Sequence, residues 1–243
     1  MNTKDIAYEC DGKILTGYLA DGAGGKRAPG ILVCHQGMGL GEHAKERARM
    51  LAELGYVAFA LDMYGEVATS REQVMALIGD LVGNPVRLRQ RAAAGLDVLK
   101  AQPGVDPDRL AAIGYCFGGG VVLEMARCHP ELACVVAFHP GLANQPEHDD
   151  RKIRPRVMVC AGVEDPLIPP AARERFIALM NEVGADWQLL TYGNAGHSFT
   201  DRTVDALGMA GFFYHAPTDR RSWAAMRDLF DEAMASCAES QPV

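Results

Sequence analysis

A cysteine set among glycines is the residue of this sequence best suited to covalent chemistry. Cys116 is the central residue of Gly114-Tyr115-Cys116-Phe117-Gly118, which follows an apolar run and opens a helical pattern. A sharp strand-to-helix turn strains its central residue and leaves room only for small neighbours, which explains the glycines. The turn would place the sulfur at a helix N-terminus, where backbone N–H groups favour the thiolate. We therefore predict a nucleophile, and a buried cysteine beside a glycine-rich turn is the alternative.

Two further side chains follow in the chain order nucleophile, acid, base. Asp165 comes after a strand-like run and before Pro166, so it should lie in a turn at the carboxyl end of a sheet. His197 lies in a glycine-rich loop after the last strand-like run. A single histidine is more often structural, and Glu164 competes with Asp165 as the acid. The agreement in order and position nevertheless favours a triad of Cys116, Asp165 and His197.

Such a triad would cleave a carbonyl compound through an acyl-enzyme. His197 would deprotonate Cys116 or hold it as a thiolate, and Asp165 would accept the other ring N–H and fix the tautomer. The thiolate would attack a carbonyl carbon, and backbone N–H groups of Phe117 and Gly37 would stabilise the oxyanion. Water activated by His197 would then release the acyl group.

An alternation of apolar runs and helical patterns predicts the elements that hold these residues. Strands at 6–8 and 14–19 are joined at Asp11-Gly12, which is a hairpin signal. The later runs are almost continuously apolar, as expected of parallel strands buried on both faces. These strands are predicted at 30–35, 57–62, 110–115, 134–139, 156–161 and 187–192, and helices at 43–54, 87–101, 119–128, 171–183 and 219–236. The fold class is therefore α/β, a single domain of residues 1–243 with a mostly parallel central sheet and helices on both faces.

One segment interrupts this alternation. Residues 65–84 are longer than a simple connection and mix a helical pattern with glycine and proline. They are predicted to form either a lid or wall over the site or an ordinary helix with irregular ends. The tail, from about residue 239 to residue 243, is predicted to be disordered.

Composition and charge disfavour several classes of protein. The chain has 243 residues, 49% of them hydrophobic, which is enough for a sizeable core. A net charge of −7 disfavours binding to nucleic acid or to an anionic membrane surface. No signal peptide is recognisable, and no apolar run reaches the ~18 residues of a membrane span.

The cysteines and histidines point to a reducing compartment and to no metal. The seven cysteines show no disulfide framework spacing, and Cys34, Cys134 and Cys160 lie in apolar runs as expected core residues. This usage predicts a cytoplasmic location. No set of cysteines and histidines has metal-ligand spacing, so neither a metal nor another cofactor is predicted.

At these positions the sequence resembles the dienelactone hydrolase family, over most of its length. The resemblance is carried by residues 35–40, 114–119, 162–165, 195–199 and 219–223. It implies an α/β-hydrolase fold, a triad of Cys116, Asp165 and His197, and oxyanion donors at Gly37 and Phe117. It also implies hydrolysis of a lactone or small carboxylic ester, a small-molecule substrate that needs no cofactor.

Two departures from the family pattern concern the activation of the thiol and the binding of the substrate. Gln36 stands where family members usually carry a glutamate that helps to activate the thiol, and an amide cannot accept a proton. Asp201 stands where these enzymes carry an arginine for the substrate carboxylate, with Arg202 next to it. Gln36 and Arg202 are therefore candidate substrate-binding residues, for a substrate that need not be dienelactone.

Two other functions compete with hydrolysis. The departures at Gln36 and Asp201 leave open a non-hydrolytic member of the fold that binds a small ligand, although a pure binder does not need a complete triad. A redox-active thiol protein is disfavoured because Cys116 has no C-x-x-C partner.

Overall fold

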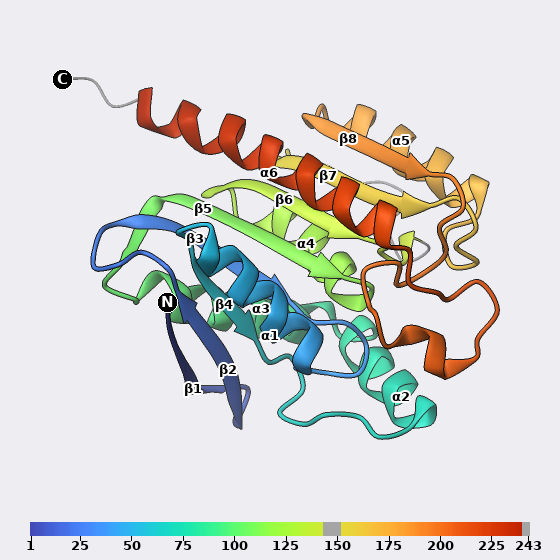
Figure 1. Cartoon of the computed structure of the whole chain (residues 1–243), viewed down its shortest axis with the longest axis horizontal. Coiled ribbons are helices and arrows are strands. Elements are labelled where there is room, and N and C mark those ends of the chain that lie inside the picture. The colour runs from blue at the N-terminus through green and yellow to red at the C-terminus, as the bar shows by residue number, and fades with distance from the viewer. Residues whose placement is uncertain (143–151, 240–243) are drawn as a thin grey trace. The chain divides into compact units, whose positions relative to one another are not determined.

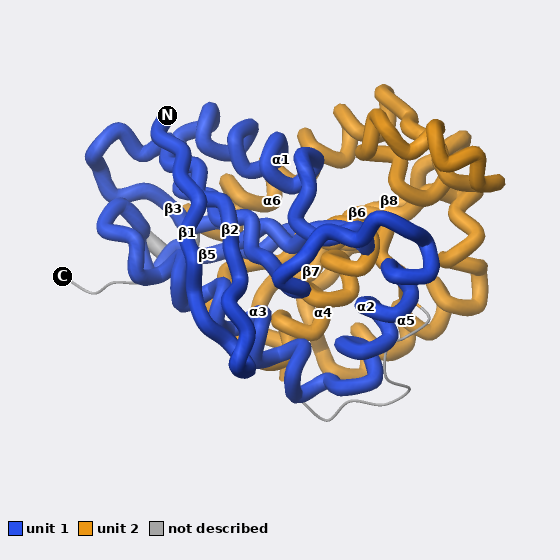
Figure 2. Tube along the Cα trace, turned by 90° about the horizontal axis from the view of Figure 1, so that it is seen from below, with its two compact units in different colours: residues 1–113 blue, residues 114–243 orange. Residues whose placement is uncertain are grey.

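The computed structural model describes residues 1–142 and 152–239, with side chains as far as residue 235. The chain divides into two compact units, residues 1–113 and 114–243 (Figure 2). The predicted disorder of the tail concerns residues that lie, apart from the first, outside the described ranges.

The first unit is built on strands in the order β1-β2-β4-β3-β5. These strands are β1 (Asn2–Cys10), β2 (Lys13–Asp21), β3 (Ala28–Cys34), β4 (Val57–Leu61) and β5 (Val105–Tyr115), which ends just past the unit boundary. The predicted hairpin is confirmed: β1 and β2 pair antiparallel around Asp11 and Gly12, whose φ angles are 56° and 67°. Positive φ at both central residues gives the turn a twist that matches its strands. β2 continues antiparallel to β4, and β4 runs parallel to β3.

Three helices accompany these strands. They are α1 (Glu42–Glu53), α2 (Arg71–Val82) and α3 (Pro85–Lys100). α1 and α3 both pack against β3 and β4, from opposite faces (Figures 1 and 2). Gly95 lets α3 approach closely, because a Cβ there would lie 2.8 Å from the Leu61 Cβ. The predicted lid or wall, residues 65–84, contains an irregular stretch followed by α2, whose N-terminus is capped by the Ser70 side chain.

The second unit holds the parallel strands β6 (Leu132–Phe138), β7 (Arg156–Gly162) and β8 (Trp187–Tyr192). Its helices are α4 (Phe117–Cys128), α5 (Pro170–Glu182) and α6 (Ala216–Glu239), with a short 3-10 helix, η2 (Val204–Leu207). α4 and α6 both pack against β6 and lie on opposite faces of it (Figure 1). Helices on both faces of parallel strands bury those strands, which is the layer arrangement that the sequence predicts.

Burial follows the predicted pattern except in β8. β4, β6 and β7 are almost entirely buried, and Cys34, Cys134 and Cys160 are confirmed as core residues with no exposure. In β8, Gln188 and Thr191 are exposed and the other residues are only half-buried. The prediction that this strand is buried on both faces is therefore wrong, because β8 is the outermost strand in the order β6-β7-β8. Within the described ranges, no helix is long and apolar enough to cross a membrane.

Candidate active site

The backbone at Cys116 is held in a conformation that few residues adopt. Cys116 is the N-cap residue of α4, with φ 53° and ψ −112°. Such a conformation costs ~1–3 kcal/mol and persists only where the surroundings fix it. The Cys116 N–H donates to the Phe138 carbonyl over 3.0 Å, at the end of β6. Gly114 is required by close approach, because a Cβ there would lie 2.0 Å from the Gly118 carbonyl oxygen. The predicted strand-to-helix turn is therefore present at Cys116.

The predicted acid and base meet directly. His197 Nδ1 lies 2.8 Å from Asp165 Oδ2, and neither side chain is exposed to solvent. The other carboxylate oxygen of Asp165 accepts the Leu167 N–H over 2.8 Å, which holds the carboxylate in one orientation. Because Asp165 accepts from Nδ1–H, the Nε2 atom of His197 is the nitrogen that can take up a proton. Glu164, the competing acid, is exposed.

The loop that carries His197 is fixed on its other side by residues 211–213. The His197 N–H donates to the Gly211 carbonyl over 2.7 Å, and the Phe213 N–H donates back to the His197 carbonyl over 3.3 Å. The ring of Phe212 packs against the imidazole with centroids 4.7 Å apart. The backbone of the next residue, Ser198, is left-handed with φ 56°. These contacts leave the imidazole little freedom to move.

The charge of His197 depends on Cys116 and Asp165. Burial opposes the charged imidazolium, but the Cys116 sulfur and the Asp165 carboxylate outweigh it and raise the pKa of His197 to about 10. The charge of the Cys116 sulfur is the larger favourable cause, and hydrogen bonding of the imidazole to Asp165 and to Cys116 adds to it. Nε2, the nitrogen turned away from Asp165, is buried. The arrangement is suited to holding a thiolate beside an imidazolium.

Comparisons with known proteins identify the family of this chain. The family model described as "Dienelactone hydrolase family" matches residues 15–234, most of the chain. The chain belongs to the dienelactone hydrolase family. A solved structure named m3DLH is 44% identical, with a TM-score of 0.91 over 96% of this chain and 98% of that one. This family member therefore has the α/β-hydrolase fold and is a dienelactone hydrolase-like hydrolase.

Two further relatives carry more specific names. The crystal structure of a dienelactone hydrolase-like promiscuous phosphotriesterase, P91 from metagenomic libraries, is 37% identical, with a TM-score of 0.88, and the alignment covers 96% of this chain and 98% of that one. A probable 2-oxo-3-(5-oxofuran-2-ylidene)propanoate lactonase of Bradyrhizobium is 26% identical over 85% of this chain and 89% of its own length. Each of these activities is the one for which the relative is named, and this chain is similar to both relatives.

The predicted oxyanion donors lie in different units. Phe117 is the first residue of α4, directly after Cys116, and is buried. Gly37 and the half-buried Gln36 follow β3 in the first unit. The Gln36 carbonyl accepts from the Gly39 N–H over 3.1 Å and contacts His35 Nδ1 at 2.7 Å, so the peptide that precedes Gly37 is fixed in orientation.

Asp201 and the next residue, Arg202, differ in exposure to solvent. Asp201 is buried, and one of its carboxylate oxygens accepts both the backbone N–H and the hydroxyl of Thr203, over 2.8 and 2.7 Å. Asp201 therefore stabilises the conformation of its own loop. Arg202 is exposed, with its guanidinium 6.0 Å from the centre of the Tyr214 ring.

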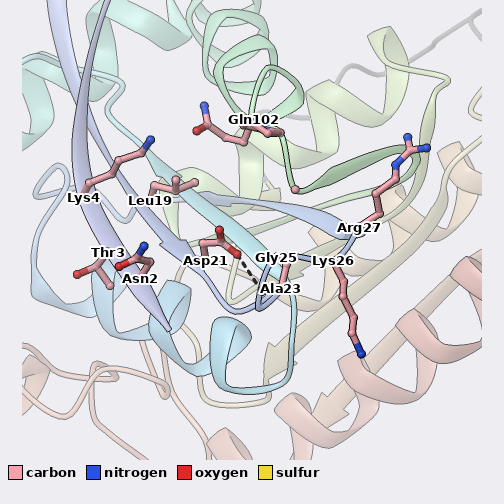
Figure 3. Close-up of a pocket in the computed structure, with 12 residues that line it drawn as sticks. Asn2, Thr3, Lys4, Leu19, Asp21, Ala23, Gly25, Lys26, Arg27 and Gln102 are labelled. Atoms are coloured by element: carbon pink, nitrogen blue, oxygen red, sulfur yellow. Dashed lines mark hydrogen bonds between the residues drawn. The ribbon is translucent and has the colours of Figure 1, made fainter.

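The described residues include no candidate metal cluster, and a cavity in the first unit is lined by none of the predicted site residues. No group of three or more His, Cys, Asp or Glu side chains that could hold a metal occurs in the part of the chain that the structure describes. A cavity of about 510 Å³ is lined by the start of β1, the end of β2 and residues 23–27 and 102–104 (Figure 3). It lies where β3 begins, whereas Gln36 and Gly37 follow the opposite end of that strand. None of the predicted site residues lines it.

The sequence did not identify every residue around His197. Phe212, which packs against the His197 ring, and Thr200, which pairs with His139, lie in loops without periodic pattern, and nothing in their spacing pointed to the site. His139 ends a predicted strand at the expected edge of the sheet, which is the signal that marks it as a neighbour of the site. Its ring lies 5.2 Å from that of His197.

Proposed function

We propose that this protein is a thiol-dependent hydrolase of lactones or small carboxylic esters, with Cys116, His197 and Asp165 as its catalytic triad. The observation that carries the proposal is the buried 2.8 Å contact between His197 and Asp165, on an imidazole whose pKa is raised in part by the Cys116 sulfur. A charged imidazole held beside a strained cysteine at a helix N-terminus stabilises a thiolate, which is the reactive form.

Acylation follows from these positions. The Cys116 thiolate attacks the carbonyl carbon, a C–S bond forms, and the carbonyl π electrons move onto oxygen. The backbone N–H of Phe117 and, on the family pattern, that of Gly37 donate to this oxyanion, each lowering the barrier by ~3–4 kcal/mol. As the intermediate collapses, the bond to the leaving oxygen breaks and the His197 imidazolium gives its proton to that oxygen. In a lactone the leaving oxygen stays on the acyl chain, so this step yields a hydroxyacyl thioester.

Deacylation reverses the roles of the same groups. The now neutral His197 takes a proton from water as that water attacks the thioester carbonyl. The C–S bond breaks, the carboxylic acid leaves, and the thiolate and imidazolium are restored. Asp165 holds the ring in one tautomer through both steps, so a single nitrogen both gives and receives the proton.

The substrate is proposed to be a lactone or ester with little negative charge near residue 201. The Bradyrhizobium relative is named a lactonase, which supports the lactone class. The arginine that holds a substrate carboxylate in the family is replaced by Asp201, which is already engaged by Thr203. Gln36 and Arg202 are proposed to contact the substrate through neutral hydrogen bonds and through the exposed guanidinium, respectively.

Turnover of two substrates by matched variants tests the proposal. Wild-type protein should hydrolyse an aryl acetate and an unsaturated γ-lactone, and Cys116→Ala should lose both activities while remaining folded. Hydrolysis that persists in Cys116→Ala at wild-type rate would mean that another group is the nucleophile.

A second activity is suggested by the relative named a promiscuous phosphotriesterase, which is 37% identical. The same thiolate could attack phosphorus in an aryl dialkyl phosphate and expel the aryl oxide. Loss of this activity together with the esterase activity in Cys116→Ala would assign both to one site.

A further inference from the structure

The backbone at His139 adopts a conformation that favours glycine. His139 follows β6 and has φ 40°, in the left-handed region where a side chain is strained. Its N–H donates to the Cys160 carbonyl over 2.8 Å, which fixes that backbone against the neighbouring strand. A glycine would be accommodated here with less strain, yet the chain places an imidazole at this point. The side chain must therefore contribute something that offsets the strain.

The imidazole of His139 links β6 to the loop of the proposed base. It is fully buried, and its Nε2 lies 2.9 Å from the Thr200 hydroxyl. Thr200 is three residues after His197 in the same loop. The His139 ring also meets His197 edge to face, with centroids 5.2 Å apart and planes inclined by 67°. One side chain thus contacts both the ring of the base and the loop that carries it.

The same short segment also supports the proposed nucleophile. Phe138, directly before His139, accepts the Cys116 N–H over 3.0 Å. Pro140, directly after it, lies so close to α4 that a Cβ on Gly119 would be 2.8 Å from the Pro140 Cβ. Residues 138–140 therefore touch the turn at Cys116 and the loop of His197. A displacement of this segment would change the separation of the two groups.

We propose that His139, through its bond to Thr200, is a positioning residue that holds the His197 imidazole at its working distance from Cys116. The inference rests on the proposed triad. Asp165 fixes the tautomer of His197, and the ring of Phe212, in the segment 211–213, packs against the His197 imidazole. His139 adds the contact to β6, the strand whose end also supports Cys116. The rate of proton transfer falls steeply as the distance between donor and acceptor grows. Loss of the contact between His139 and Thr200 should therefore lower kcat more than it changes substrate binding.

Three variants separate positioning from general stability. His139→Gly relieves the backbone but removes a fully buried ring and leaves a cavity, so the melting temperature of each variant is measured and activity is compared at a temperature at which all of them are folded. His139→Gln keeps a polar group that can bond to Thr200, and Thr200→Val removes only the hydroxyl. We expect His139→Gly to lower kcat for an aryl acetate by ~10- to 100-fold with little change in KM. His139→Gln should recover much of this loss, and Thr200→Val should fall between wild type and His139→Gly.

Two further readouts distinguish positioning from other roles. The pH profile of the rate at which iodoacetamide alkylates Cys116 should shift to higher pH in His139→Gly, because a displaced imidazolium stabilises the thiolate less. The double variant His139→Gly/Thr200→Val should be no slower than His139→Gly alone, since both changes break one interaction. Unchanged kcat and an unchanged alkylation profile in His139→Gly would overturn the inference, as would fully additive losses in the double variant. If the single variant Cys116→Ala kept its esterase activity, the proposed triad itself would fail, and that control is separate from every His139 variant.

Discussion

Replacing Asp165 with asparagine removes one negative charge from the buried pair and changes little else. The His197–Asp165 contact is 2.8 Å, and both side chains are shielded from water. Two unit charges with centres about 4 Å apart interact by ~4 kcal/mol at an effective dielectric constant of ~20. This energy corresponds to ~3 pKa units. The pKa of His197, raised to about 10 first by the charge of the Cys116 sulfur and then by Asp165, should therefore fall in Asp165→Asn while staying under the influence of Cys116.

The kinetic effect should be larger than the electrostatic one alone. An asparagine amide can donate to Nδ1, which would place the ring proton on Nε2 and leave that nitrogen unable to accept a proton. A wrong tautomer of this kind lowers kcat by ~10⁴-fold in a Ser-His-Asp enzyme, and a loss of at least ~10³-fold is expected here. The assay is kcat and kcat/KM for an aryl acetate between about pH 5 and about pH 10, where the imidazole titrates.

Glu164→Gln provides the matched control. Glu164 precedes Asp165 in the chain but is exposed, so its charge is screened by water. This variant should keep kcat within about twofold of wild type, since removing an exposed charge changes local energies by less than ~0.5 kcal/mol. An Asp165→Asn variant that retained most of the wild-type rate, or a Glu164→Gln variant with the larger loss, would refute the assignment of the acid.

The remaining predictions concern stability. His197 has a folded-state pKa of about 10, above its ordinary value, so its charged form stabilises the fold fully below about pH 6.5, and that contribution is lost as pH rises toward 10. Urea unfolding should therefore show the advantage of wild type over His197→Gln shrinking across this range, and a constant difference would contradict the pKa shift. Gly114→Ala should prevent stable folding or cost at least ~3 kcal/mol, because its Cβ would lie 2.0 Å from the Gly118 carbonyl oxygen. Gly120→Ala, where the Cβ would meet nothing within 4 Å inside α4, should instead stabilise the protein by up to ~1 kcal/mol in the same thermal or urea unfolding assay. Equal effects of the two alanine substitutions would mean that the turn at Cys116 is not sterically defined.

Local signals in the sequence were enough to predict most elements. The Asp11-Gly12 pair marks a two-residue turn, and the structure has that turn between β1 and β2. Apolar runs predicted the other strands because parallel strands are buried on both faces. The start of β5 was missed, since Asp106, Asp108 and Arg109 make its first half polar. There the Asp106 carboxylate accepts from Arg109 over 2.8 Å, a contact that the pattern of hydrophobicity cannot express.

Long-range contacts explain the rest of the difference. The motif around Cys116 and the chain order of Asp165 and His197 predicted a site that contains these three residues. Asp165 and His197 are in contact although they lie 32 positions apart. The pairing of His139 with Thr200 spans 61 positions and depends on a left-handed backbone at a residue other than glycine. Neither feature leaves a periodic signal. The edge position of β8 likewise depends on strand order, which composition does not encode.

Trapping the acyl-enzyme tests the central claim most directly. Wild-type protein mixed with an aryl acetate and quenched in acid within the first turnover should carry one acetyl group, because a thioester survives acid. Digestion and mass spectrometry should place that group on the peptide containing Cys116, and it should be absent from Cys116→Ala. Acetylation at any other residue during turnover, or a burst of aryl oxide in the first turnover with no acetyl group on Cys116, would contradict nucleophilic catalysis by Cys116.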